Sequence, residues 1–530
     1  MKECDAGCGW WLIVPESVLS ELINLFFDKV QGWLPLFHRP RFCKTYLRNG
    51  IFDKGISSRI TTIDSLLLCG MFALAARHST NPWFRDIAAQ DRGQRFADDA
   101  LKYYEMSGVS EQTSALQYLQ GCILLTFYLY TAGPSHRAWV LAGVCVRLAY
   151  EMNLCSMDEQ EEDHSVDPSD WSYAEERRRA FWLVWEVDTF GSVMSRRPSS
   201  VNRSMMAVRL PVADAAWFAD TPVQSPVIDP RPSKAWGILQ ESPNEHEWAW
   251  YIVAHFLMTI ASEYAASRHT TRHDEDELAE SMACFSLLIA QRFSLESLGF
   301  SQPIDAAKHN WVIGMHLMLV CGRSTIRASF AGQFLGLSRH PARVCLQWQP
   351  EHILLSHPFL ACCLLSDLAY PSEDALKEPD TLAHNNEVVK LVLLQYASVW
   401  KLGSVVADLR ASLTRGDTPL VAAPIKKRFA LYFPSRVKSR RCQNSRVCQP
   451  GLLPETTRLG MREDITNTEE TTFDRLLAPQ EYPHQLPQFT EQTRSIEPGM
   501  TDLASPPAGD VSNFLHFYGL NEWALRSSAD

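Results

Sequence analysis

Cysteine is the residue type whose spacing most often marks a metal site in a chain of this kind. Structural zinc sites need closely spaced thiolates, typically as Cys-x-x-Cys units. None of the 14 cysteines in this 530-residue chain forms such a unit. Cys4 and Cys8 stand alone near the start, and Cys442 and Cys448 are a lone pair in a basic segment. The sequence therefore predicts no metal site and no cofactor site in this chain.

Motifs of common catalytic sites are absent from the sequence. It contains no Gly-x-Ser-x-Gly elbow, no phosphate-binding loop ending in Lys-Ser or Lys-Thr, and no His-Glu-x-x-His. His269 and His273 lie one turn apart beside acids, which favours an exposed helix start over a metal site. His309 and His316 share an apolar segment and are typical of hydrogen-bonded core histidines. The sequence predicts no catalytic residue, and an unrecognised all-α enzyme stays a third alternative.

A block from Glu175 to Pro198 combines charged, aromatic and helix-ending residues. At a helical period its aromatic residues form an apolar side, while charged residues crowd the first turns. Neighbouring acids cancel much of the positive field of the arginines, so ion pairs within the fold are favoured over contacts with DNA phosphates. Arg178 or Arg179 is expected to pair with Glu175 or Asp188. The site residues predicted in this block are Glu175, Arg177, Arg178, Arg179, Trp182, Asp188, Arg197 and Pro198.

This block resembles the signature of the middle homology region of fungal transcription factors, also called the fungal-specific or xylanolytic-activator-type regulatory domain of zinc-cluster transcription factors. Four further segments resemble the family, in the family's order, between Leu22 and about Pro211. Together the five blocks are far more specific than a single motif. One position departs from the family, because Arg196 stands where the family usually has glycine before the Arg-Pro pair. The four segments are LINLFFDKVQGWLPLFHRPRF, LLLCGMFALAARHS, ALQYLQGCILLTFYLYTAG and SHRAWVLAGVCVRLAYEMNL.

The resemblance implies a nuclear regulator of RNA polymerase II transcription. Its helical domain would act through self-association, ligand sensing or partner contacts, and promoter DNA would be reached directly or through a partner. A homodimer or heterodimer and a small-molecule effector are compatible with this reading. Many relatives control gene clusters for secondary metabolism or nutrient use. The resemblance thus implies a regulator of such a cluster, with activation and repression left open.

Family members typically carry an N-terminal zinc cluster, in which six cysteines bind two zinc ions. No such cluster is present in this sequence. Zinc is expected only if an upstream cluster belongs to the protein. Two alternatives stay open: this is a truncated form of a zinc-cluster activator, or it is a co-regulator or dominant-negative partner that lacks its own DNA-binding module.

The composition indicates a globular protein with no membrane partner. Hydrophobic residues make up 46% of the chain, which is long enough to bury a large core. The formal net charge of -11 argues against coating of nucleic acid by the overall field. The cysteines are scattered through apolar segments, as in reduced proteins of the cytosol or nucleus. The longest apolar segments, 122–130 and 311–321, are too short to span a bilayer.

Apolar residues recur at three- and four-residue spacings along the first 415 residues. This pattern predicts an all-α fold, a large multi-helix bundle that is partly solenoid-like. Pro15 is expected to open the first helix, which ends near Gly32. The acidic insert from Asp158 to Asp170 is expected to be a solvated loop. Further helices are expected at 61–78, 81–106, 111–131, 135–153, 173–195, 248–267, 275–298, 306–330, 352–368 and 382–413.

The predicted domain organisation follows the changes in composition. Residues 15–211 form the N-terminal core of the regulatory domain, 212–243 a Pro-rich connection, 244–415 a continuation of the helical domain, and 416–530 a mostly disordered tail. A segment at 510–523 in the tail is a candidate activation or docking helix. Two basic clusters in the tail are typical of a bipartite nuclear-import signal, with an exposed basic linker as the alternative. The residues of these clusters are Lys426, Lys427, Arg428, Arg436, Lys438, Arg440 and Arg441.

Overall fold

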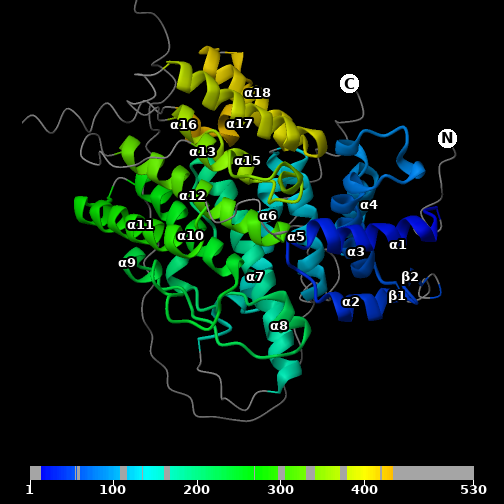
Figure 1. Cartoon of the computed structure of the whole chain (residues 1–530). Helices are drawn as coiled ribbons and strands as arrows, with labels where there is room; N and C mark the ends of the chain where they lie inside the picture. Colours follow the sequence, from blue (N-terminus) through cyan, green and yellow to red (C-terminus); the bar gives the residue numbers. More distant parts are fainter. Residues whose placement is uncertain are drawn as a thin grey trace, which may run out of the picture. The chain divides into compact units, whose positions relative to one another are not determined.

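The computed structural model of the chain is mostly helical where it describes the protein (Figure 1). This confirms the all-α, multi-helix prediction. A single antiparallel pair of short strands, β1 (Leu47–Arg48) and β2 (Ile51–Phe52), is present among the described residues. The predicted tail beyond residue 433, with its terminal helix at 510–523, lies outside them. The described residues are 13–433 except for 54, 56–59, 108–115, 134, 160–166, 268, 296–304, 330–340, 370–378 and 418–419.

The helices follow one another along the chain with mostly short connections. The first group is α1 (Glu16–Leu25), continued by a π-helical turn at Phe26–Val30, α2 (Arg39–Tyr46), α3 (Thr62–Ala75), α4 (Gln94–Ser107), α5 (Leu116–Thr131), α6 (His136–Glu151) and α7 (Pro168–Ser195). The second group is α8 (Asp214–Phe218), α9 (Pro232–Ala235), α10 (Glu247–Ala266), α11 (Arg272–Arg292) and α12 (Ala306–Ser329). The third group is α13 (Pro341–Cys345), α14 (Pro350–Ile353), α15 (Leu360–Cys363), α16 (Ser366–Ala369), α17 (Pro379–Val399), α18 (Lys401–Arg415) and α19 (Ala423–Arg428), followed by a 3-10 turn at Ala430–Tyr432.

Side-chain caps explain where several helices begin. The Thr61 hydroxyl accepts the N–H of Asp64 at 3.1 Å, and the Asp64 carboxylate accepts the N–H of Thr61 at 2.9 Å. Thr271 and Asp274 form the same reciprocal pair at the start of α11. These bonds satisfy N–H groups that have no partner inside the helix. Both helices therefore start at a residue that the local sequence specifies.

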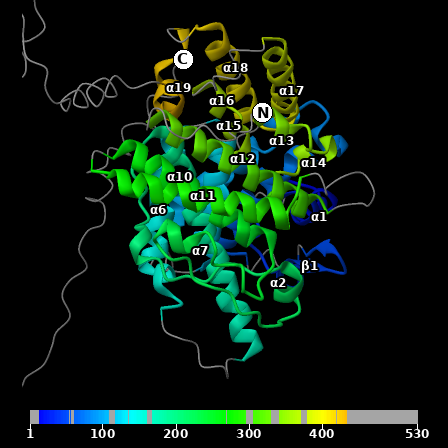
Figure 2. The same ribbon diagram turned by 60° about the vertical axis from the view of Figure 1, so that its left-hand side comes forward.

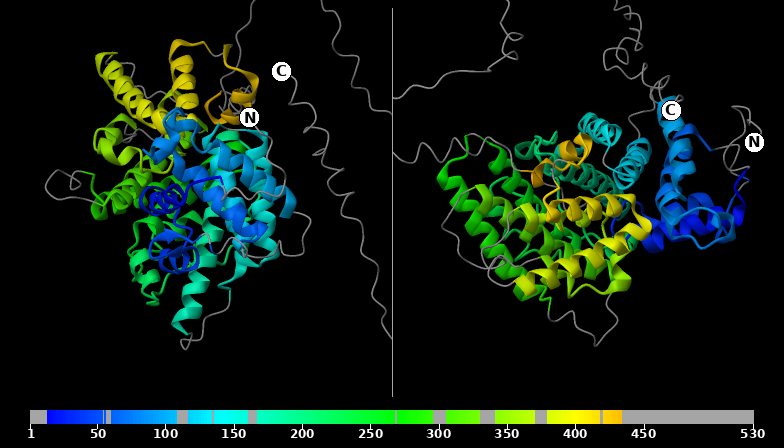
Figure 3. Two further views of the ribbon diagram at one scale, coloured as in Figure 1. Left: turned by 90° about the vertical axis from the view of Figure 1, so that its right-hand side faces the viewer. Right: turned by 90° about the horizontal axis from the view of Figure 1, so that it is seen from above.

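The helices pack in neighbouring pairs and triplets around one hydrophobic core. α3 packs against α4 and α5, α5 packs against α6 and α7, and α17 packs against α18. α10 lies beside α12, as two views show (Figure 1, Figure 2). α19, orange in Figure 3, contacts α7. The largest fully buried side chains are tryptophans: Trp33, Trp182, Trp217, Trp248, Trp250 and Trp400.

Three predicted helices are interrupted in the structure. The predicted helix at 81–106 forms 3-10 turns at Pro82–Phe84 and Ala89–Asp91, and the α-helix begins only at Gln94, after Gly93, which lies against the carbonyl of Ala73 with no room for a side chain. The predicted helix at 352–368 is three short helices, α14, α15 and α16, and Pro358 lies in the gap before α15. The predicted helix at 382–413 is two helices, because Trp400 is extended (φ −120°, ψ 121°).

The acidic insert is partly buried, contrary to the expectation of a solvated loop. Asp158 is only 8% exposed, and α7 already begins at Pro168, before the predicted start at residue 173. Residues 160–166 of the insert lie outside the described residues. Within the Pro-rich connection at 212–243, the short helices α8 and α9 form. In the part of the chain that the structure describes, no helix has both the length and the apolar character to cross a membrane.

Candidate functional site

Helix α7 carries the predicted site residues 175–188, and local sequence sets where it starts. The Asp167 carboxylate accepts the N–H of Ser169 at 2.8 Å and thereby caps the first turn. Pro168 occupies the first helical position, where a missing N–H has no cost. The helix then runs for 28 residues to Ser195, and most of its side chains are buried. This placement makes α7 a central element of the core.

A residue in the left-handed conformation ends α7. Arg196 has φ 50° and ψ 47°, a region in which a side chain costs roughly 1–2 kcal/mol and which glycine adopts freely. The N–H of Arg197 donates to the carbonyl of Ser192 at 2.9 Å and closes the last turn. The guanidinium of Arg196 donates to the carbonyl of Leu431 at 3.2 Å. Arg196 therefore adopts the turn that the usual glycine would make, and it adds a contact that glycine lacks.

Arg196→Gly is expected to leave the free energy of unfolding within about 0.5 kcal/mol of the natural chain. Release of the left-handed strain offsets the loss of a hydrogen bond, which is worth about 1 kcal/mol. The matched control is Arg177→Gly, at an exposed position inside the same helix, where glycine should cost about 1 kcal/mol. Urea denaturation of both variants measures the difference. An equal loss at the two positions would contradict the strained turn.

Arg179 is a buried arginine that ties α7 to two other segments of the chain. Its side chain is 0% exposed, and its Nε lies 3.1 Å from the Glu175 carboxylate. A second nitrogen lies 2.5 Å from the Asp214 carboxylate, and a third donates to the Val212 carbonyl at 2.6 Å. The guanidinium also stacks over the Trp217 ring at 4.0 Å. Arg179 thus fixes the start of the connection at 212–217 on α7, and the predicted pairing with Glu175 is present.

Arg178 makes a second buried ion pair, with an acid that sequence reasoning missed. Its Nε and one terminal nitrogen bond both oxygens of Asp158, at 2.9 and 2.7 Å. The same carboxylate accepts the N–H of Arg209 at 2.8 Å. Glu175 lies 3.8 Å from Arg178, and burial raises the pKa of Glu175 while Arg179 and Arg178 oppose that rise. Nothing in the local sequence identified Asp158 as a buried partner of Arg178, because the loop that contains it is polar and acidic.

The other predicted residues of α7 take different roles. Of the two acids predicted as alternative partners of the arginines, Glu175 forms the pair and Asp188 does not. The carboxylate of Asp188 accepts the backbone N–H groups of residues 200–201 at 2.7 and 3.1 Å. This pairing replaces the ion pair because the chain folds back over Asp188 directly after the helix. Trp182 is buried, as predicted, and donates its ring N–H to the carbonyl of Arg209 at 2.8 Å. Arg177 is exposed.

A buried polar group in the middle of α7 was also missed. Glu186 is 1% exposed, and its carboxylate accepts the hydroxyl of Tyr251 at 2.9 Å. Nε2 of His357 lies 3.4 Å away. Burial raises the pKa of Glu186 to about 8 and lowers the pKa of His357 well below its usual value. One sequence feature could have identified Glu186 as a buried acid. The large apolar residues Trp182 and Phe190 lie one helical turn before it and one turn after it.

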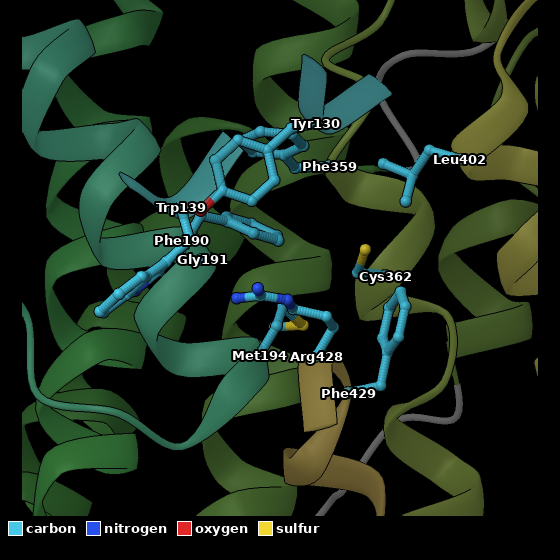
Figure 4. Close-up of a pocket in the computed structure, with 10 residues that line it drawn as sticks. All are labelled: Tyr130, Trp139, Phe190, Gly191, Met194, Phe359, Cys362, Leu402, Arg428 and Phe429. Carbon is cyan, nitrogen blue, oxygen red and sulfur yellow. The ribbon is translucent and has the colours of Figure 1, made fainter. Parts of the chain in front are cut away.

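Two pockets lie at the C-terminal end of α7. The first contains about 30 Å³ that a water-sized sphere can reach, within about 410 Å³ of empty space that includes its open mouth (Figure 4). Its walls are mostly apolar and include Tyr130, Phe190, Phe359 and Leu402. The second has about 380 Å³ and is lined by hydroxyl groups and by predicted residues Arg197 and Pro198. The second pocket is in the size range of sites that bind a small molecule, whereas the first has room for about two water molecules.

The basic clusters of the predicted import signal are only partly described. Lys426, Lys427 and Arg428 form the last turn of α19. Arg428 is half-buried, and its guanidinium points into the first pocket (Figure 4). The import signal itself stays a prediction. Its remaining residues, Arg436, Lys438, Arg440 and Arg441, lie outside the described residues.

The histidines of the apolar segment lie in the core and have partners, as predicted. Nδ1 of His309 lies 2.7 Å from Nδ1 of His352, and its Nε2 lies 3.2 Å from the carbonyl of Gln347. Nε2 of His316 lies 3.2 Å from the carbonyl of Phe293. Within the described ranges, no group of three or more His, Cys, Asp or Glu side chains is placed to hold a metal ion.

Comparison with known proteins gives a consistent result. Residues 23–280 match the family model described as the fungal specific transcription factor domain. This range begins in α1 and ends in α11, so it includes the whole of α7. No solved structure matches the chain.

Several curated relatives are similar to part of the chain. A tropolone cluster transcription factor of Talaromyces stipitatus is 28% identical over 209 residues, which are 39% of this chain and 35% of that protein. A citrinin biosynthesis transcriptional activator of Monascus ruber is 24% identical over 220 residues, 42% of this chain and 40% of its own length. A pigment biosynthesis transcriptional activator of Monascus ruber is 27% identical over 203 residues, 38% of this chain and 34% of its own length. The chain thus covers well under half of the length of these relatives.

Proposed function

Because residues 23–280 form a fungal specific transcription factor domain, we propose that the chain is a nuclear regulator of RNA polymerase II transcription that acts through its helical domain. The observation that carries the proposal is the family match, which extends from α1 to α11. The relatives named above support a finer proposal, control of a secondary-metabolite gene cluster, since their names refer to tropolone, citrinin and pigment biosynthesis. No catalytic step belongs to this function.

The regulatory action would consist of binding and conformational change. Carboxylates hold Arg178 and Arg179 inside the fold, so these arginines have a structural role. Contacts with DNA phosphates would have to come from other residues. The net charge of -11 also favours promoter contact through a local basic element or through a partner. The burial of Arg178 and Arg179 also supports a second candidate function, that of a co-regulator which another protein recruits.

Chromatin occupancy together with transcript levels tests the proposal. The chain would be tagged in its native fungus, and occupied promoters would be compared with the transcripts that change when its gene is deleted. We expect occupied promoters to coincide with a set of clustered genes that change. A chain that occupies no promoter and whose deletion leaves transcripts unchanged would overturn the function.

Purified protein separates direct regulation from recruitment. A direct regulator binds fragments of the occupied promoters with an affinity that falls steeply as salt rises, because phosphate contacts release counterions. A recruited co-regulator binds those fragments only after a partner is added. In either case Arg177→Gln, at an exposed position of α7, serves as a control that keeps the buried ion pairs intact.

A further inference from the structure

The second pocket combines positive charge with hydroxyl groups. Arg196 and Arg197, at the end of α7, line its space of about 380 Å³. The carboxylate of Glu263, the acid in the lining, lies 3.0 Å from the guanidinium of Arg203, so a cation already compensates its charge. A partner that enters the pocket therefore meets positive charge together with groups that donate and accept hydrogen bonds. The hydroxyl groups belong to Ser192, Ser199, Thr259, Ser262 and Ser267.

Arg197 connects this pocket to further cations on α19. Its guanidinium stacks over the ring of Trp139 at 4.5 Å, and 6.2 Å separate that ring from the ring of His136. Trp139 and Arg428 line the first pocket together, so Arg428 lies close to the same tryptophan (Figure 4). Lys427 precedes Arg428 on α19, which contacts α7, and it is exposed. The basic surface formed in this way comprises Arg196, Arg197, Lys427, Arg428 and Trp139.

Three of these cations have no acidic partner inside the fold. In the ranges that the structure describes, no carboxylate forms an ion pair with Arg197, Lys427 or Arg428. Their positive field also acts on His136, whose pKa is lowered by burial first and then by these three cations. A negatively charged partner would therefore be attracted to the basic surface without having to displace a carboxylate of the protein.

The small extent of the basic surface favours a short acidic peptide over duplex DNA. A duplex is a long polyanion with one charge per about 1.7 Å of its axis, so it would extend beyond a few cations onto the rest of the protein. That remainder is acidic, because the whole chain has a formal net charge of -11. A short peptide contacts the basic surface alone, and charges farther than about 8 Å from it are screened at physiological salt.

Building on the proposed function, we propose that the basic surface and the second pocket together bind an acidic segment of a partner protein. Aspartate or glutamate side chains of the segment pair with Arg197 and Arg428, whose planar guanidinium groups match carboxylates. The backbone of the segment lies in the second pocket, where hydroxyl groups donate to its carbonyls and accept from its N–H groups. This surface names the kind of partner through which the regulator would act.

A bound segment would join two parts of the fold. Arg197 directly follows the end of α7, whereas Arg428 is the last residue of α19. The turn after α19 is anchored on the core by the Tyr432 hydroxyl, which donates to the carbonyl of Cys362 at 2.6 Å. A peptide that contacts both arginines should therefore slow backbone hydrogen exchange in residues 423–433.

Hexaglutamate and hexaglutamine, which have the same length but differ in charge, test the proposal on the full chain. Fluorescence anisotropy of the labelled peptides should show that hexaglutamate binds about tenfold more tightly or better, with an affinity that falls as salt rises. Arg197→Gln should weaken hexaglutamate binding about tenfold, because it removes a charge-assisted bond at the centre of the surface. Lys427→Gln should weaken it about threefold, because water screens exposed pairs.

The matched control is Arg343→Gln, which also removes an exposed positive charge. Arg343 belongs to α13, which packs against α12 and α17, and its variant should bind hexaglutamate as the natural chain does. Arg197→Lys, which keeps the charge, should retain part of the affinity. Thermal unfolding of each variant verifies that it folds.

Several results would overturn the proposal. Equal affinity for hexaglutamine, or no binding at millimolar hexaglutamate, would reject an acidic partner. Unchanged binding in the Arg197 and Lys427 variants would place the peptide elsewhere, for example on the four cations at 436–441. A short random-sequence duplex that displaces hexaglutamate at an equal concentration of charge would identify a nucleic-acid surface instead. Chromatin occupancy is measured separately, so occupied promoters without peptide binding would reject this surface and leave the proposed function standing.

Discussion

Arg179→Ala is expected to lower the free energy of unfolding by about 3–5 kcal/mol, enough to unfold a large fraction of a marginally stable protein. The substitution leaves Glu175 buried without its closest cation and removes the bonds to Asp214 and Val212. It also removes the guanidinium that stacks on Trp217. Urea or thermal denaturation followed by circular dichroism measures the loss.

The matched control is another arginine that pairs with an acid and stacks on a ring, but at the surface. Arg39 lies 3.1 Å from Asp28, and these side chains are 43% and 52% exposed. It also lies over the ring of Phe27. Arg39→Ala should cost at most about 1 kcal/mol, because water screens exposed pairs. A similar cost at the two sites would show that burial of Arg179 carries no special penalty.

A double variant identifies the origin of the loss at Arg179. If the penalty comes from a stranded carboxylate, Arg179→Met combined with Glu175→Gln should be more stable than Arg179→Met alone. Replacing a buried pair by uncharged groups is often neutral, whereas removal of one partner is costly. Non-additive losses of about 1 kcal/mol or more in this cycle would show the coupling. Additive losses would place the energy in the contacts with residues 212–217 instead.

Glu186→Gln is expected to stabilise the protein at alkaline pH by on the order of 3 kcal/mol, with a gain that shrinks toward pH 5. Burial raises the pKa of Glu186 from its ordinary 4.5 to about 8 in the folded state. Between these values the folded chain keeps a proton that the unfolded chain loses, so stability falls as pH rises. Glutamine does not titrate, and its carbonyl can still accept the hydroxyl of Tyr251.

Denaturation of the natural chain and the variant at a series of pH values between 5 and 8.5 measures this gain. The control is Glu387→Gln on α17, whose side chain is 57% exposed and whose partner is Lys390. That variant should differ from the natural chain by a small amount that does not grow with pH. A constant difference for Glu186→Gln would mean that Glu186 is ionised across the range, paired with a protonated His357.

Sequence periodicity predicted the all-α fold well, because apolar residues that recur every three or four positions indicate amphipathic helices. It failed where one residue interrupted a continuing pattern. Pro358 stops a helix between two apolar stretches, and the break at Trp400 has no local signal, since tryptophan is compatible with a helix. The role of Gly93 could not be predicted either, because it depends on contact with the carbonyl of Ala73, which is distant in sequence.

The buried polar contacts were predictable only when both partners lay on one helix. The pair of Arg179 with Glu175 follows from their four-residue spacing. The pair of Arg178 with Asp158 depends on how a polar loop folds back on the helix, which sequence spacing does not encode. The resemblance allowed a small-molecule pocket among these helices, but its walls were not predicted, because they come from distant segments, such as Tyr130 and Phe359, that meet only in the folded chain.

The length and anchoring of α7 have a mechanical consequence. At about 1.5 Å per residue, its 28 residues extend about 42 Å, and about 26 Å separate the buried Arg179 from Arg196 at its end. Arg179 is the twelfth residue of the helix, so α7 is held by buried charges within its length and by buried side chains up to Ser195. The constant rise per residue therefore fixes the distance between the buried ion pairs and the pockets at the C-terminal end.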